Sequence, residues 1–147
     1  MAILFNDEFT DYTEAKKQYE EALKINPRYA DAHNNLAYLL HKKLEDYEGA
    51  KDHYLEALII TPDDFKVHND FGNLLEKHFE DYPGAREQYE KALMINPEAA
   101  TVHFNMISLL IKHFADKNGA KNHYMKAVEI DSSFIKPDLD VFFSIKR

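Results

Sequence analysis

The chain has 147 residues, of which 45% are apolar and 30% charged, with only four Gly and five Pro to interrupt regular structure. This composition excludes a disordered chain, and a net charge of −8 spread among mixed signs disfavours nucleic acid as a partner. There are no Cys residues, which excludes disulfides and thiolate metal sites.

The N-terminal run Met1–Phe5 is too short for a signal-peptide core, and no stretch approaches the ~20 apolar residues of a membrane span. We therefore expect a cytoplasmic protein with no membrane partner.

A pattern of small and aromatic residues recurs every 35 residues along the chain, which indicates an array of helical repeats. One continuous array over residues 1–147 is therefore expected. The recurring members are Ala15, Ala50, Ala85 and Ala120; Tyr19, Tyr54, Tyr89 and Tyr124; and Ala22, Ala57, Ala92 and Ala127.

The first stretch, residues 11–28, carries only the second half of this pattern. Aligning Leu4 and Phe5 with Leu39 and Leu40 places the start of the sequence inside a first helix. We therefore predict that residues 11–28 form the second helix of a truncated first unit, with Asp11 at its N-cap.

Residues 29–63 show the complete pattern, with Leu36 and Leu40 at helical spacing in one half and Tyr54 and Ala57 in the other. The pattern predicts a helical hairpin whose second helix is capped by Asp46 and ends just before Pro62. Ala50 and Ala57 allow the helices to approach closely.

Residues 64–98 repeat this hairpin, and residues 99–133 are predicted to form a degenerate terminal unit in which Lys117 replaces the turn tyrosine. Residues 134–147 predict an apolar C-terminal helix, with Pro137 in its first turn. Apolar ends favour association of repeat arrays, so Leu4, Phe5, Phe142 and Phe143 are candidates for a homo-oligomer contact.

The order of residues in each unit resembles the tetratricopeptide repeat, which has 34 residues. In residues 29–63 the matching positions are Leu36, Ala37, Leu40, Ala50, Tyr54, Ala57 and Pro62. Each unit departs from the family by one extra residue near the turn between its helices, and by His33, His68 and His103 at the usual aromatic position. The resemblance implies an all-α, right-handed superhelical solenoid of antiparallel helical hairpins.

The resemblance also implies a protein or peptide partner, held on a concave face that is formed by the first helix of each hairpin. Amide side chains dominate the matching positions and suit the backbone of an extended peptide, because each can both donate and accept. The candidate groove residues are Asn34, Asn35, Tyr38, His41, Lys42, Lys66, Asn69, Asp70, Asn73, Lys77, Thr101, Phe104, Asn105, Ser108 and Lys112, with Glu76 and Ile111 between them.

Two alternatives stay open for this face. Asn35 and Asn105 could instead bond neighbouring helices, and the row formed by Lys42, Lys77 and Lys112 could prefer acidic groups or be solvated. An oligomerisation or assembly element, or a fragment of a larger scaffold or signalling protein, is the alternative function.

The periodic histidines His33, His68 and His103 are interpreted as packing residues. Equivalent positions on stacked helices lie about 8 to 10 Å apart, too far to share a zinc ion. The other histidines, His41, His53, His78, His113 and His123, are expected to be solvated. Burial of the first three predicts a fold that weakens between pH 7 and pH 5.

No catalytic constellation is apparent in the sequence. The chain has no glycine-rich phosphate loop, and its serines lack the glycine context of an activated nucleophile. We expect a protein that is not an enzyme and uses no cofactor.

Overall fold

The computed structural model describes the backbone of residues 2–146 and the side chains of residues 11–146. Within these residues the chain is helical, with no strand. The helices are α1 (Ala2–Ile25), α2 (Ala30–Leu39), the π-helical η1 (Leu40–Leu44), α3 (Tyr47–Ile60), α4 (Phe65–His78), α5 (Tyr82–Ile95), α6 (Ala100–His113), α7 (Lys117–Ile130), the 3-10 helix η2 (Ser132–Phe134) and α8 (Pro137–Phe142).

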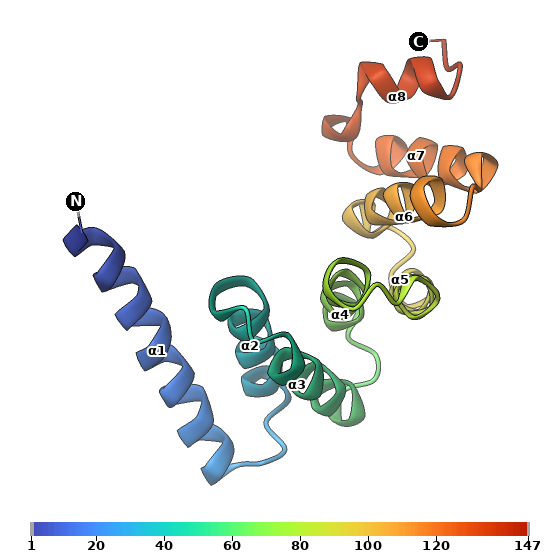
Figure 1. Cartoon of the computed structure of the whole chain (residues 1–147). Coiled ribbons are helices and arrows are strands. Elements are labelled where there is room, and N and C mark those ends of the chain that lie inside the picture. Colours follow the sequence, from blue (N-terminus) through green and yellow to red (C-terminus); the bar gives the residue numbers. More distant parts are fainter. Residues whose placement is uncertain (1, 147) are drawn as a thin grey trace.

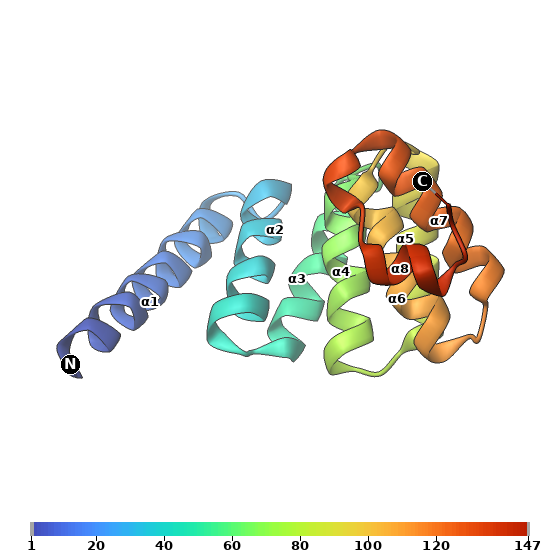
Figure 2. The same ribbon diagram turned by 90° about the horizontal axis from the view of Figure 1, so that it is seen from above.

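The helices form a curved, all-α solenoid with the two ends of the chain at opposite ends of the array (Figure 1). The pairs α2–α3, α4–α5 and α6–α7 lie within residues 29–63, 64–98 and 99–133. Figure 1 also shows α2 and α4 on the inner side of the curve with α3 and α5 outside them, and in that view α7 lies between α6 and α8. Leu139 of α8 lines a pocket together with residues of α6, and the two helices overlap when viewed from above (Figure 2).

The start of the array differs from the sequence-based expectation. The predicted N-cap Asp11 lies inside α1, which is one continuous helix from Ala2 to Ile25. The prediction of a turn at Asp11 was therefore wrong, and the chain opens with a single long helix. The α1 segment lacks the glycine that follows each of the other capping aspartates by three residues, because Glu14 stands there.

The end of the array also differs. The helix expected over residues 134–147 is only the short α8, and Ser144 just after it has a positive φ of 55°. This left-handed residue ends the helix, so the predicted apolar face does not continue to Lys146.

Each second helix contributes small residues and one tyrosine to the core, which the first helices fill with larger apolar side chains such as Leu36 and Phe71. Ala50, Tyr54 and Ala57 on α3 are fully buried, as are their equivalents on α5 and α7. Burial of a methyl group at each alanine permits close packing of the paired helices, which confirms the role predicted for these positions.

Each second helix of a hairpin begins with the predicted aspartate cap. The carboxylate of Asp46 accepts a hydrogen bond from the backbone N–H of Gly49 at 3.0 Å, and the caps at Asp81 and Asp116 repeat this at 2.9 and 2.8 Å. A Cβ on Gly49 would lie 2.6 Å from the capping carboxylate. The recurring glycine is thus explained by lack of space beside the cap.

The turn before each cap accommodates the extra residue of the 35-residue unit. The N–H of Asp46 donates to the carbonyl of Leu40, six residues earlier, at 3.0 Å, whereas the common helix ending spans five. The residue before each capping aspartate has a positive φ between 52° and 54°. Those residues are Glu45, Glu80 and Ala115.

Candidate protein-interaction surface

The inner face of α2, α4 and α6 carries the predicted groove residues. Of the fifteen side chains, seven are exposed to solvent, seven are half-buried and one is buried. The exposed side chains include Asn35, Tyr38, Lys66, Thr101 and Lys112.

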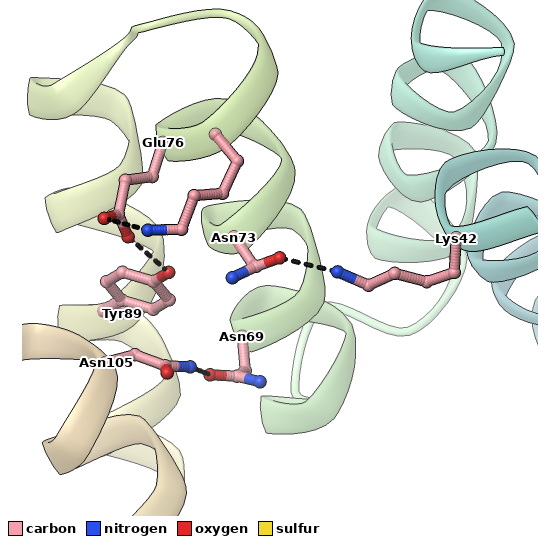
Figure 3. Close-up of polar contacts among 7 residues, drawn as sticks. Lys42, Asn69, Asn73, Glu76, Tyr89 and Asn105 are labelled. Atoms are coloured by element: carbon pink, nitrogen blue, oxygen red, sulfur yellow. Dashed lines mark hydrogen bonds and ion pairs between the residues drawn. The ribbon is translucent and has the colours of Figure 1, made fainter. Parts of the chain in front are cut away.

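Two hydrogen bonds connect this face across the hairpins (Figure 3). The Nζ of Lys42 on η1, which continues α2, donates to the Oδ1 of Asn73 on α4 at 2.7 Å. The amide of Asn105 on α6 donates to the Oδ1 of Asn69 on α4 at 2.9 Å. For Asn105, the alternative of bonding to a neighbouring helix is therefore the one observed, and the three first helices share one polar strip.

A buried carboxylate joins α4 to α5 below this strip. Glu76 is only 5% exposed, and it accepts a hydrogen bond from the hydroxyl of Tyr89 at 3.1 Å and from Lys77 Nζ at 2.7 Å (Figure 3). Burial beside Glu76 raises the pKa of the Tyr89 hydroxyl, first through desolvation and then through the carboxylate charge. Glu76 is therefore held by a hydrogen bond from Tyr89, and its negative charge is balanced by Lys77.

The residues equivalent to Glu76 and Tyr89 one unit earlier do not form this hydrogen bond. His41 occupies the place of Glu76, and neither its Nδ1 nor the buried hydroxyl of Tyr54 has a hydrogen-bond partner among the described residues. The Oδ1 of Asn34 is likewise buried and unpartnered. Burial lowers the pKa of His41 to about 4, assisted by the charges of Lys42 and His78.

His41 is only 3% exposed. The prediction that it lines the groove and contacts a peptide was therefore wrong, because its ring packs edge-on against Tyr54 and His78. Sequence position placed it on the right helix, but its side chain turns toward α3.

Asp70 is the half-buried acid of this strip. Burial raises the pKa of its carboxyl group, and this effect is opposed by a hydrogen bond from Asn69 and by the charge of Lys42. The strip thus combines amides, lysines and one carboxyl group, so its charged groups are of both signs.

An apolar pocket interrupts the strip at its C-terminal end. It has a volume of about 240 Å³ between α6 and α8. Its lining residues are Phe104, Ile107, Ser108, Ile111, Lys112 and Leu139. The sequence analysis placed Phe104, Ser108 and Lys112 on this face, but it did not anticipate that Leu139 would close a pocket over them.

A larger pocket, which the sequence analysis missed, lies on the outer side between α3 and α5. Its volume is about 440 Å³, and Ile59 and Met94 beside it are 70% and 82% exposed. The sequence does carry a signal for this pocket, because Ile59 and Met94 are apolar residues at equivalent positions of the two outer helices.

The three periodic histidines attach each connecting loop to its own hairpin. His33, His68 and His103 are buried, and the Nε2 of each bonds the carbonyl of the proline six residues earlier at 2.9 to 3.0 Å. The Nδ1 of each bonds the residue twenty positions later, which is His53, Gln88 or His123. Their predicted packing role is confirmed.

The expectation that the remaining histidines are solvated was wrong for most of them. His53 and His123 are half-buried and bond His33 and His103 at 2.9 and 2.7 Å. Because a carbonyl only accepts, Nε2 of His33 carries a proton, so its Nδ1 accepts from His53 when both rings are neutral.

His78 and His113 are exposed, yet their rings stack on tyrosines of the preceding hairpin. The ring centroids of Tyr47 and His78 are 3.7 Å apart, and those of Tyr82 and His113 are 3.5 Å apart. These tyrosines therefore pack between neighbouring hairpins.

The apolar residues proposed for self-association divide into three cases. The side chains of Leu4 and Phe5 lie outside the described ones. Phe143 is buried, 3% exposed, with its ring 5.6 Å from that of Tyr124, so its predicted place on a contact surface was wrong. Phe142 is 41% exposed.

The described residues contain neither a membrane-spanning helix nor a metal-binding cluster. No helix there combines the length and the apolar character needed to cross a bilayer. No three His, Cys, Asp or Glu side chains within residues 11–146 converge to hold a metal ion.

Comparison with known proteins gives matches at the levels of family and fold. A family model described as TPR repeat matches residues 11–43, and one described as tetratricopeptide repeat matches residues 30–64. No curated protein sequence matches the chain.

Several solved structures share the fold. A structure described as MamA aligns with a TM-score of 0.77 and 14% identity, over 85% of this chain and 71% of that one. MamA 41-end from Desulfovibrio magneticus RS-1 aligns with a TM-score of 0.74 and 21% identity, over 86% of this chain and 70% of that one. The MamA RS-1 ArsTM double mutant gives 0.75 and 21%, with the same coverage.

At these identities the structural matches establish the fold alone, and the family models establish the repeats. Residues 11–64 match models of the tetratricopeptide repeat, and the whole chain has the fold of a helical solenoid of that kind.

Proposed function

We propose that the chain is a non-catalytic interaction module that binds an extended peptide segment of a partner protein along the inner face of α2, α4 and α6. The observation that carries this proposal is the continuous polar strip, in which Lys42 reaches Asn73 and Asn105 reaches Asn69 across successive hairpins. Such a strip keeps the three helices in fixed register beside one another.

Hydrogen-bonding capacity remains after these contacts. A side-chain amide has two donor hydrogens and an oxygen that accepts twice, so one bond uses only part of its capacity. Exposed Asn35 and Thr101 add further groups on the same side of the array. Main-chain N–H and C=O groups of an extended peptide could therefore be paired with little dependence on its sequence.

The test is selection of peptides from a random display library on the folded protein, followed by titration of the selected peptide into ¹⁵N-labelled protein. We expect amide shifts concentrated in α2, α4 and α6. Asn35→Glu and Thr101→Glu should weaken binding about tenfold or more, as for truncation of central contacts. Asn122→Glu on α7 is the matched control, because it adds the same charge at an exposed position of an outer helix.

Shifts confined to α3, α5 and α7, or equal losses in the control and the inner-face variants, would refute an inner-face site. A nucleotide or metal found with the purified protein would instead contradict the non-catalytic part of the proposal.

Assembly is a second candidate, favoured by the exposed apolar surface of α8. Val141 is 80% exposed and Phe142 41%, although Lys117 lies over the Phe142 ring at 4.4 Å. Light scattering after size exclusion, across a hundredfold range of concentration, measures the mass directly. A mass that rises with concentration and falls in Phe142→Ser would support assembly, and a constant monomer would exclude it.

A further inference from the structure

The inner face changes character at its third hairpin. Positions that are equivalent at a step of 35 residues hold Asn34, Asn69 and then Phe104, and further along the helix His41, Glu76 and then Ile111. Two polar positions have thus become apolar on α6. They line the pocket of about 240 Å³ that is closed on one side by Leu139 of α8.

The walls of this pocket are held in place by neighbouring elements. The ring of Phe104 packs against that of Phe134 in η2, with centroids 5.2 Å apart. The α8 wall is tied to α7, because the Tyr124 hydroxyl donates to Asp140 at 2.9 Å and accepts from the N–H of Lys136 at 2.8 Å. The pocket is therefore supported from two sides.

Its size selects the kind of group that fits. Pockets for small molecules usually have volumes of about 300 to 1,000 Å³, and this one is smaller. An apolar lining of this extent suits one large aliphatic or aromatic side chain.

The charge at the edge of the pocket comes from Lys112. Its equivalent in the preceding hairpin, Lys77, is paired with the carboxylate of Glu76 at 2.7 Å, and Lys42 bonds Asn73. Ile111 stands where Glu76 would be, and Lys112 has no hydrogen bond or ion pair to any described residue. Of the three lysines in this row, it alone lacks a partner within the part of the chain that the structure describes.

We infer that this pocket binds a partner segment in which a large apolar side chain stands next to an acidic side chain: the apolar group enters between Phe104 and Leu139, and the carboxylate meets Lys112. The inference rests on the proposed function, since it adds a sequence preference to the same inner face. The net charge of −8 does not oppose such a contact, because charges farther than about 8 Å are screened at physiological salt.

The experiment uses three acetylated and amidated hexapeptides that differ only at their centre: Gly-Ser-Leu-Glu-Ser-Gly, the same peptide with Gln for Glu, and the same peptide with Ala for Leu. Each is titrated to several millimolar into the ¹⁵N-labelled full chain. The Leu-Glu peptide should shift amides of residues 104–112 and 139. Its affinity should exceed that of the Gln peptide about threefold and that of the Ala peptide about tenfold.

Two variants locate the effect. Lys112→Gln should remove the preference for Glu over Gln while the preference for Leu persists. Ser108→Leu should fill the pocket and remove both preferences, with an unchanged far-ultraviolet spectrum showing that the helices remain. Lys77→Gln, the matched position 35 residues earlier, should leave both preferences as they are.

Equal affinities for the three peptides, no shifts with any of them, or a Glu preference that survives Lys112→Gln would overturn the inference. A fourth peptide that ends at Leu with a free carboxylate tests the other source of negative charge. If it binds more tightly than the Leu-Glu peptide, the acidic side chain is the wrong assignment. Failure here is distinguishable from failure of the proposed function, because the display selection reports inner-face binding whatever the peptide sequence.

Discussion

The hairpins of residues 29–63 and 64–98 share the same helix pair and capping aspartate, but they differ in the hydrogen-bond partner of one buried tyrosine hydroxyl. Tyr89 donates to Glu76, whereas the hydroxyl of Tyr54 has no partner among the described residues, and His41 stands in the place equivalent to Glu76. In the next hairpin, Asp140 of α8 and Lys136 just before that helix supply the partners of Tyr124. The comparison teaches that the tyrosine ring is buried in the same way in all three hairpins, while the hydrogen bonding of its hydroxyl differs from one hairpin to the next.

The largest expected effect is loss of the acid that serves Tyr89. Glu76→Leu should lower the free energy of unfolding by about 2 to 4 kcal/mol, because it leaves a buried hydroxyl unpaired. His41→Leu, the matched change one unit earlier, should cost less than about 1 kcal/mol, since the Nδ1 that it removes has no partner among the described residues and the Nε2 bonds only the exposed Lys42, at 3.2 Å. Urea denaturation of both variants measures the difference, and equal losses would break the comparison.

The second effect is a dependence on pH that arises in the first hairpin. Burial holds the pKa of His41 at about 4 in the folded state, against about 6.5 when unfolded. The neutral ring is favoured on folding, so its stabilisation is present above pH 6.5 and is lost as the pH falls toward 4. We expect the free energy of unfolding to drop by about 1 to 2 kcal/mol between pH 7 and pH 5.

Lowered pKa values of His53 and His123, caused by burial and by their partner histidines, act in the same direction. The raised pKa of Asp70 acts against it. His41→Gln should remove most of the drop in denaturation experiments at the two pH values, and His53→Gln, which copies the Gln88 of the next hairpin, should remove a smaller part. A drop of unchanged size in both variants would assign the pH dependence to other groups.

The tyrosines themselves give a third and smaller contrast. Tyr89→Phe should cost about 1 kcal/mol because it deletes the hydrogen bond to Glu76. Tyr54→Phe should be neutral or slightly stabilising, since the hydroxyl that it removes is buried without a partner. Melting temperatures of the two single variants decide this, and a larger loss in Tyr54→Phe would show that its hydroxyl has a partner in solution.

The smallest effect should be the same in both hairpins. Glu45→Gly and Glu80→Gly should each raise the free energy of unfolding by about 0.5 to 1 kcal/mol, because glycine relieves the cost of a positive φ. Glu48→Gly, inside the first turn of α3, is the control and should destabilise. Destabilisation by the first two changes would contradict the wide turn.

Most of the helix boundaries and core positions could be predicted from the sequence, because they depend on local rules that each unit repeats. The aspartate caps, the helix ends before the prolines and the buried Ala50 and Tyr54 all follow from spacing along one chain. The turn at Asp11 was predicted from the 35-residue spacing alone, and the available signal against it was Glu14 in place of the glycine that follows the capping aspartates by three residues.

Predictions for the candidate site were less complete, because they depend on contacts between units. Helical position put His41 on the inner helix, but its rotation toward Tyr54 depends on the next hairpin. The pocket beside Phe104 needs Leu139, which belongs to a segment whose path the repeat pattern does not specify. The peptide site itself remains a prediction.

The wide turn before each capping aspartate has a consequence for how the array can be lengthened. Because Leu40, Glu45 and Asp46 recur as Leu75, Glu80 and Asp81 with the same bond between the first and last, a copied block of 35 residues would carry its own complete ending and its own start signal. A block of 34 or 36 residues would shift the capping aspartate relative to the last turn of the preceding helix, so that the hydrogen bond spanning six residues could not form. Insertion of a duplicate of residues 29–63 should therefore extend the solenoid by one hairpin without new junction chemistry.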